Sequence, residues 1–232
     1  MNARSIGLSI GVFSCVLALS LAPSAYATAE LQLSNGTASV DILDGDPGDT
    51  CGVADCVTYN GPVGAWTVNV TTGQSKDLSA PVLLDLQSLD THSSSDGSTL
   101  TILFSDNGFT PAFPNFTFDV GGKLSTLGTI TFSLFGGGSN TKFDTAPSNQ
   151  IGSTLTFHTT GTFTGSTQGL SGGSADPYSL TERITLTFGN AQGKATQLAA
   201  DVTAVPEPIS ILLMGTVLLL VVGAIRRKAQ PQ

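Results

Sequence analysis

The alternation of residue types between residues 180 and 188 is the feature that most constrains the fold of this chain. Leu180, Ile184, Leu186 and Phe188 alternate with threonine and arginine along the segment LTERITLTF. Successive side chains of a β-strand point to opposite faces, so this period of two places the apolar set on one buried face. The segment therefore predicts a half-buried strand, the clearest in the chain.

Further short strand signals occur at close intervals before and after it. They cover residues 31–42 with a hairpin turn at Asn35-Gly36, then 65–70, 83–86, 100–104, 129–135, 155–163 and a last strand ending near 202. In the 65–70 segment, the spacing places Trp66 in the core. The sequence between residues 28 and 205 shows no long helical period and no fixed repeat, and its turns are rich in glycine. Roughly eight to ten short strands predict an all-β domain, a single β-sandwich of jelly-roll or immunoglobulin-like type.

The C-terminal region predicts a membrane-spanning helix. Residues 209–225 are 17 consecutive residues without a charge, which is about 26 Å of helix and the short end of a bilayer span. Pro206 and Pro208 precede them, and proline disfavours helical geometry in the residue before it, so the helix is expected to begin after Pro208.

A basic cluster fixes the expected orientation of this helix. Arg226, Arg227 and Lys228 follow it directly, and basic residues beside a span stay on the cytoplasmic side. Residues 229–232 are then a short cytoplasmic tail, and everything upstream of the helix is expected outside the cell membrane.

The order of these features resembles the C-terminal sorting signal of the PEP-CTERM family of exported bacterial proteins. That order is Val-Pro-Glu-Pro, an apolar helix and a basic cluster, over residues 205–228. The resemblance implies that Pro206, Glu207 and Pro208 form the motif recognised by a membrane enzyme called exosortase. It also implies delivery to the envelope of a bacterium that makes exopolysaccharide. The alternative is an ordinary single-pass anchor, and the two differ on whether the mature protein keeps its tail.

The N-terminal residues 1–27 predict a secretory signal peptide. Arg4 precedes an apolar stretch over 6–21, and the small-residue tripeptide ending at Ala27 suits cleavage after that residue. An N-terminal anchor is the alternative, but serines interrupt the stretch and Pro23 ends it. The signal peptide implies entry through the secretory translocon.

The exported region is strongly acidic. Residues 28–205 hold five basic and sixteen acidic residues, a net charge of −11. Phosphates would be repelled, so nucleic acid and anionic lipids are not expected partners, whereas cations or neutral glycans are. Within this region we predict the sandwich over residues 28–198 and a linker to the membrane over 199–205.

Cys51 and Cys56 are the only cysteines of this exported region. An oxidising compartment favours a disulfide between them. The redox-active alternative is weak, because the spacing is not Cys-x-x-Cys and no basic neighbour would lower a thiol pKa.

The acidic loop around these cysteines is the candidate metal site. Asp44, Asp46 and Asp49 could supply the oxygen ligands that calcium prefers, with Asp41 and Asp55 nearby. The spacing lacks the EF-hand pattern, and aspartate with glycine and proline is also what any solvated turn uses.

Catalytic motifs are weak. His92 and His158 do not lie at metal-protease or zinc-site spacing, and no serine occupies a nucleophile elbow. Paired carboxylates for glycoside hydrolysis remain open, and the acids that could converge are Asp85, Asp90, Asp106, Asp119 and Glu182. We therefore predict a protein that is not an enzyme.

Several interior phrases also resemble a recurrent ectodomain of PEP-CTERM proteins that has no assigned activity. They lie at residues 66–73, 84–89, 100–109 and 177–184. Together these features predict an envelope or matrix protein with a structural or adhesive role beside exopolysaccharide. A glycan- or calcium-binding module is the alternative, and an envelope hydrolase is a second one.

Overall fold

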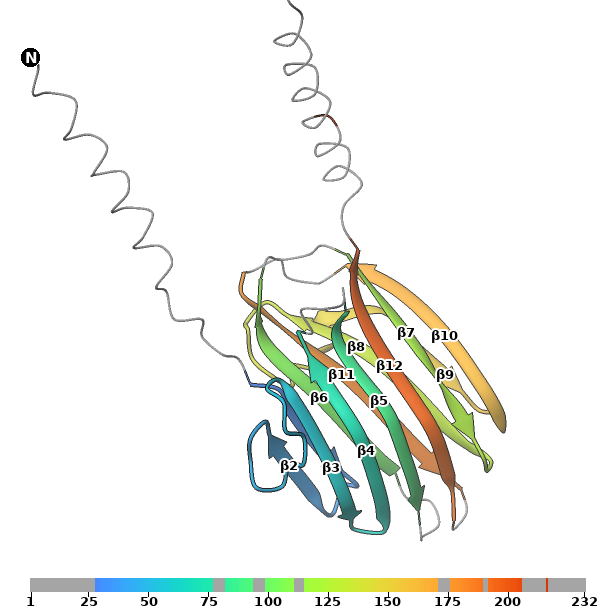
Figure 1. The fold of residues 1–232 in the computed structure, drawn as a ribbon. Coiled ribbons are helices and arrows are strands. Elements are labelled where there is room, and N and C mark those ends of the chain that lie inside the picture. The colour runs from blue at the N-terminus through green and yellow to red at the C-terminus, as the bar shows by residue number, and fades with distance from the viewer. Residues whose placement is uncertain are drawn as a thin grey trace, which may run out of the picture.

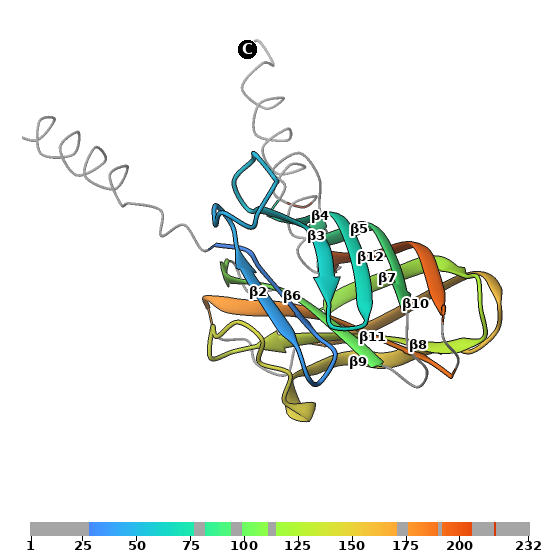
Figure 2. The same cartoon turned by 90° about the horizontal axis from the view of Figure 1, so that it is seen from below.

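The chain forms a sandwich of two antiparallel β-sheets (Figure 1). This computed structural model describes residues 28–76, 82–93, 99–110, 115–170, 176–189, 192–205 and the single residue 216. Twelve strands, β1 to β12, are described, and one short 3-10 helix, η2 (Pro147–Asn149), lies between β8 and β9. Figure 2, seen from below, shows the two sheets as layers facing each other. The predicted all-β sandwich is confirmed.

Sheet A has six strands and contains the strand predicted most clearly from the sequence. In spatial order they are β2 (Ser39–Leu43), β1 (Glu30–Ser34), β6 (Thr99–Phe109), β11 (Tyr178–Phe188), β8 (Gly128–Gly137) and β9 (Gln150–Phe157). The strand expected over 180–188 is β11, which pairs with β6 and β8 near the middle of this sheet.

Sheet B also has six strands. In spatial order they are β10 (Gly161–Leu170), β7 (Asn115–Leu124), β12 (Lys194–Val205), β5 (Val82–Ser93), β4 (Trp66–Ser75) and β3 (Cys56–Val63). From β5 to β8, and again from β9 to β12, each successive strand lies in the opposite sheet. This crossing makes most contacts between neighbouring strands long-range in sequence.

The core lies between the sheets and is built from the inward residue of each alternating pair. Trp66 is 1% exposed, as its spacing predicts, and its ring packs 5.6 Å from that of Phe188. Phe104, Phe118 and Phe132 are completely buried in the same cluster. Burying an aromatic or aliphatic side chain of this size stabilises a fold by about 1.5–3 kcal/mol, so the phenylalanines contribute much of the sandwich stability.

The predicted first hairpin is confirmed. β1 pairs with β2 around Asn35 and Gly36, and Gly36 has φ +86°, which glycine adopts without steric cost. The Asn35 side-chain oxygen accepts the backbone N–H of Thr37 at 3.1 Å and of Ala38 at 2.7 Å. The turn is therefore fixed by its own asparagine.

The strands β3 and β7 were not predicted, and three further features differ from the sequence prediction. The segment 155–163 was expected as one strand, but it contains the end of β9, a turn and the start of β10 at Gly161, where φ is +113°. The strand predicted over 83–86 is longer in the structure, because β5 continues through His92 to Ser93. The linker predicted over 199–205 is wrong, because β12 continues through Val205 and pairs with both β5 and β7.

The predicted signal peptide (1–27), the Pro206-Glu207-Pro208 motif and the basic cluster lie outside the described residues. The predicted helix 209–225 also lies outside them apart from residue 216. Within the part of the chain that the structure describes, no helix has the length and apolar character needed to cross a membrane.

Candidate functional site

The acidic loop between β2 and β3 uses its carboxylates to hold its own backbone. Each of the three candidate calcium ligands accepts backbone N–H groups. The Asp44 carboxylate accepts the backbone N–H of Asp55 at 2.7 Å, and the Asp46 carboxylate accepts that of Leu43 at 3.2 Å. The Asp49 carboxylate accepts the backbone N–H groups of Cys51 and Thr58 at 2.8 Å each. Such bonds are typical of aspartate-rich turns. Among the described residues no group of three or more His, Cys, Asp or Glu side chains is arranged to hold a metal ion, and calcium at this loop stays a prediction.

The predicted disulfide is present in this loop. Cys51 and Cys56 are bonded, with their Cα atoms 5.8 Å apart. Cys56 begins β3 and is buried, with Gln74 of β4 opposite it. The disulfide therefore connects the acidic loop to the edge of sheet B.

A buried ion pair closes the same end of the sandwich. Asp106 of β6 is fully buried, and its carboxylate accepts from Lys76 Nζ at 2.8 Å and from the Ser75 hydroxyl. Lys76 also lies 4.8 Å from the centre of the Phe109 ring. Burial raises the pKa of nearby Asp55, and the charge of Asp106 raises it further. Asp106 is thus a structural acid with its own counter-ion.

Glu182, another acid considered for catalysis, lies inside the core. Its side chain projects from β11 into the sandwich with 0% exposure, and both carboxyl oxygens lack a hydrogen-bond partner. Burial raises its pKa well above the ordinary range, and the carboxylates of Asp85 and Asp201 raise it further. The neutral acid is therefore favoured, out of contact with solvent.

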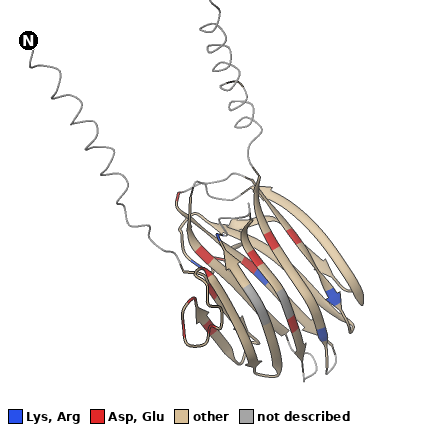
Figure 3. Ribbon diagram, in the orientation of Figure 1, with Lys and Arg blue, Asp and Glu red and all other residues tan. Residues whose placement is uncertain are grey.

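The outer face of sheet B carries a row of three aspartates on adjacent strands. Asp201 of β12 lies opposite Asp85 of β5 on one side and opposite Asp119 of β7 on the other. The residues before and after Asp201, Ala200 and Val202, are buried, so Asp201 points outward. Figure 3 shows acidic positions on several strands of this sheet. Like charges opposite one another destabilise a sheet, so this row lowers the stability of the fold.

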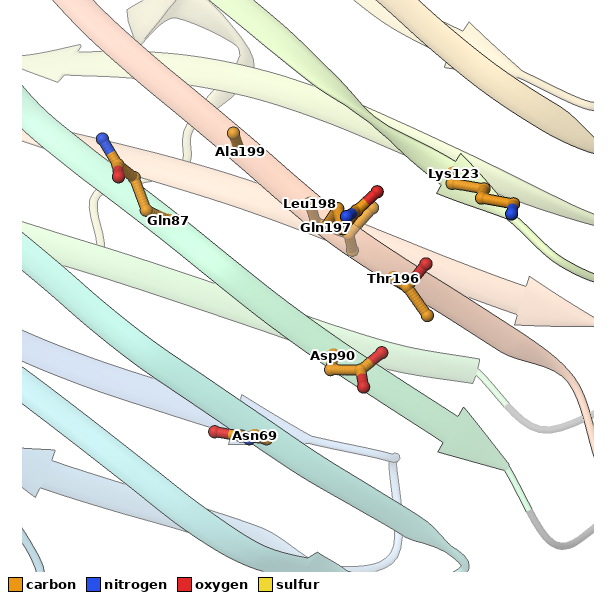
Figure 4. A pocket seen from close by; sticks show the side chains of 8 residues that line it. All are labelled: Asn69, Gln87, Asp90, Lys123, Thr196, Gln197, Leu198 and Ala199. Carbon is orange, nitrogen blue, oxygen red and sulfur yellow. The ribbon is translucent and has the colours of Figure 1, made fainter.

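A depression of about 630 Å³ lies beside this row on the same face (Figure 4). Strands β4, β5, β7 and β12 contribute its lining. The residues are Asn69, Gln87, Asp90, Lys123, Thr196, Gln197, Leu198 and Ala199. The lining combines three carboxamides, one hydroxyl, one carboxylate and one ammonium group.

A second depression of about 540 Å³ adjoins the first and shares Ala199 with it. Its lining comes from β7, β10 and β12, namely Asp119, Val120, Gly121, Thr164, Gly165, Ser166, Ala199 and Asp201. Gly121 and Ala199 lie opposite each other at the junction, so small residues form the floor. We call the two depressions together the sheet-B groove. It crosses five strands, about 19 Å at the usual spacing between strands.

A backbone irregularity lies in the middle of the groove. Ala195 and Leu198 of β12 are both fully buried although three positions separate them, and the pairing with β7 shifts between Thr196 and Ala199. This is a β-bulge, a feature that re-aims side chains. Within it Gln197 has φ +54°, a left-handed conformation that costs a residue with a side chain roughly 1–2 kcal/mol.

Several polar side chains of the groove are free to bind a ligand. Among the interactions between described residues, the side chains of Asn69, Asp90 and Gln197 make no hydrogen bond, and all three are exposed. Gln87 donates to the carboxylate of Asp85 at 2.6 Å. The groove therefore offers donors and acceptors together on an open surface.

The structure brings some of the sequence candidates together and separates others. Asp90 and Asp119 line the groove and Asp85 lies beside it, whereas Asp106 and Glu182 are buried elsewhere. The sequence predicted a last strand ending near residue 202, which corresponds to most of β12, but residues 199–205 were also assigned to a linker, so Asp201 was not placed in the site. The alternation of apolar Ala200 and Val202 with Asp201 was the signal that could have found it.

No family model matches the chain, and no curated protein matches it. Similar solved structures include TmCBM61 in complex with β-1,4-galactotriose, at a TM-score of 0.35 and 11% identity, covering 61% of this chain and 88% of that one. The xylan-binding CBM22-1 domain of Paenibacillus barcinonensis Xyn10C has a TM-score of 0.35 and 14% identity, covering 68% and 90%.

The enzymatically active domain of a bacteriophage CBA120 tailspike protein has a TM-score of 0.37 and 10% identity, covering 65% of this chain. The alignment spans 19% of the tailspike chain. At TM-scores this low, none of these likenesses carries an argument about what this chain binds.

Proposed function

We propose that this protein is an exported all-β protein that binds a neutral glycan chain in the sheet-B groove. The observation that carries the proposal is the groove itself, two adjoining depressions with a floor of Gly121 and Ala199. Hydroxyl groups both donate and accept hydrogen bonds, and the carboxamides and carboxylates around this floor supply both partners. The length of the groove suits an extended chain rather than a single small molecule.

The charge of the groove selects among glycans. Four aspartates, Asp85, Asp90, Asp119 and Asp201, lie in or beside it, against the single cation of Lys123. An anionic polysaccharide would meet a repulsive potential across most of this length. Neutral chains are therefore the better ligands.

The proposed role is adhesive and depends on delivery outside the cell. The predicted signal peptide would direct the chain to the translocon, and the Pro206-Glu207-Pro208 tail would present it at the membrane to an exosortase-like enzyme. A β-sandwich left in the envelope or matrix, with a glycan-binding face, would attach to exopolysaccharide. A jelly-roll form of the sandwich is supported by the repeated crossing of successive strands between the sheets.

Binding rather than hydrolysis is the activity we propose for the groove. Glycoside hydrolysis usually needs one carboxylic acid held protonated beside a second carboxylate. Among the described residues, burial raises the pKa of Glu182, which lies in the core, and of Asp55, which lies in the disulfide-bonded loop, and neither acid lines the groove. A binding protein therefore fits the arrangement of acids better than a hydrolase.

Isothermal titration of the full-length protein in detergent tests the proposal, with soluble neutral oligosaccharides and alginate as an anionic comparison. Ala199→Tyr would fill the junction of the two depressions and should weaken binding at least tenfold. Thr185→Tyr is the matched control, because it adds the same ring to an outward position of sheet A. Unchanged binding by Ala199→Tyr, or tighter binding of alginate, would contradict the proposal, and released sugars would show hydrolysis.

A further inference from the structure

Three carboxamide side chains line the first depression of the sheet-B groove. Asn69 comes from β4, Gln87 from β5 and Gln197 from β12, so three neighbouring strands supply one kind of group (Figure 4). A carboxamide offers two donors and one acceptor in a fixed plane. Asp90, in the same lining, adds an acceptor, and Lys123 adds a donor.

Gln197 is held there by the bulge of β12, at a conformational cost that no interaction of its own side chain with the described residues offsets. Its φ of +54° is a region that glycine adopts freely and asparagine tolerates better than most residues. Among the described residues its side chain makes no hydrogen bond or ion pair. It is also exposed, so it fills no space in the core. Strained residues of this kind are concentrated at ligand-binding positions.

The bulge explains how the strain serves the groove. In a regular strand, inward and outward side chains alternate. Only one outward side chain would then lie between Ala195 and the next inward residue. The extra residue places both Thr196 and Gln197 between two fully buried positions. Thr196 and Gln197 both line the depression as a result.

We propose that this depression is a subsite for the acetamido group of an N-acetylated amino sugar. The inference rests on the proposed glycan binding and names the sugar class. An acetamido group presents one N–H donor and one C=O acceptor. The carboxamides of Gln197 and Asn69 can each supply an acceptor for this N–H and a donor for this C=O. Its methyl group can lie against the small apolar floor at Ala199.

The depression should select for the acetamido group, because a sugar without it would leave the carboxamides of the lining without hydrogen-bond partners. A site built to hydrogen-bond a particular group discriminates strongly against an analogue that lacks it, because binding then leaves polar groups desolvated and without partners. The groove is open, so the effect is smaller than in a closed pocket. We expect roughly a tenfold preference for an N-acetylated chain over its hydroxyl analogue.

The test compares two tetramers with the same β-1,4 linkage, one of N-acetylglucosamine and one of glucose, by isothermal titration of the full-length protein. Wild type should bind the N-acetylated tetramer about tenfold more tightly. Gln197→Gly, which accepts the positive φ, should bring the two affinities within twofold of each other. Gln197→Asn keeps a carboxamide and should retain part of the preference. Gln168→Ala removes an amide of β10 outside the depression and should leave the ratio unchanged.

The outcomes separate this inference from the proposal on which it depends. Equal binding of both tetramers by wild type would overturn the acetamido subsite while leaving glycan binding intact. A preference that survives Gln197→Gly would also overturn it. If no neutral glycan binds and Ala199→Tyr changes nothing, the proposed function itself fails, and the subsite fails with it.

Discussion

Lys76 Nζ lies 2.8 Å from a carboxylate oxygen of Asp106, a residue with no exposed surface. Removing the lysine would leave a buried carboxylate without its counter-ion, which is strongly destabilising. We expect Lys76→Ala to lower the free energy of unfolding by about 3 kcal/mol, measured by urea titration. Lys123→Ala removes an exposed ammonium from the groove and serves as the control, with an expected change of less than about 0.5 kcal/mol. Equal effects of the two substitutions would contradict the structural role of the pair.

The buried acid Glu182 predicts an unusual dependence of stability on pH. Its pKa is raised in the folded state above the ordinary value of 4.5, so the unfolded chain loses this proton first as pH rises. The contribution is fully present below pH 4.5 and is lost progressively as pH rises toward the folded pKa. Urea titrations of wild type and Glu182→Gln at pH 4 and pH 8 isolate the contribution of Glu182 to the free energy of unfolding, since the two proteins share every other titrating group. Stability of wild type should fall more between these pH values than that of Glu182→Gln.

A second substitution at this position tests whether burial of the carboxyl group is the cause of the pH dependence. Glu182→Leu removes two oxygens that have no partner inside an apolar core, and should raise the free energy of unfolding at pH 8 by about 1–3 kcal/mol. A destabilised Glu182→Leu would show that the carboxyl group is supported by the fold.

Most of the fold could be predicted from the sequence because its signals are local. The alternation in β11, the Asn35-Gly36 turn and the inward spacing of Trp66 each depend on a few adjacent residues, and all three match the structure. The strand β7 was not predicted although Phe116, Phe118 and Val120 alternate with polar residues. A different error occurred where the alternation is broken. The bulge at Gln197 interrupts the period of two in β12, where the sequence predicted both a last strand ending near residue 202 and a linker over 199–205.

The site could not be predicted because it depends on pairing between distant strands. Asp85, Asp119 and Asp201 form one row only once β5, β7 and β12 are neighbours in sheet B. The sequence shows three separate acids, each an ordinary outward residue of a strand. The strain of Gln197 is likewise invisible before the backbone is known, because glutamine is not a residue that signals a positive φ.

The strain at Gln197 predicts a stabilising substitution. Gln197→Gly places the residue that best accepts φ +54° at this position, and should raise the free energy of unfolding by about 1 kcal/mol. Gln168→Gly is the matched control in β10, since glycine in a regular strand should lower stability by about 0.5–1 kcal/mol. Urea titration measures both. If Gln197→Gly and Gln168→Gly changed the free energy of unfolding in the same direction, backbone strain at Gln197 would be contradicted.

The Cys51–Cys56 disulfide predicts a moderate loss of stability on reduction. It closes a loop of about six residues, for which chain entropy gives about 2 kcal/mol. We expect Cys51→Ser/Cys56→Ser to lower the free energy of unfolding by this amount while the sandwich stays folded. Wild type should gain about 2 Da on reduction, as intact-mass analysis would show, since each sulfur takes up one hydrogen. An unchanged mass would show that the bond does not form in the exported protein.

The aspartate row predicts a stabilising and salt-dependent substitution. Asp201 lies opposite both Asp85 and Asp119, so Asp201→Asn removes the middle of three like charges while keeping the size of the side chain. The free energy of unfolding should rise by about 0.5 kcal/mol at low salt. At about 1 M salt the Debye length falls to about 3 Å, and the difference between variant and wild type should shrink toward zero. Asp46→Asn in the acidic loop is the control, because it weakens the acceptor for the Leu43 amide and should lower stability at both salt concentrations. A salt-independent gain for Asp201→Asn would indicate that relief of charge repulsion is not its cause.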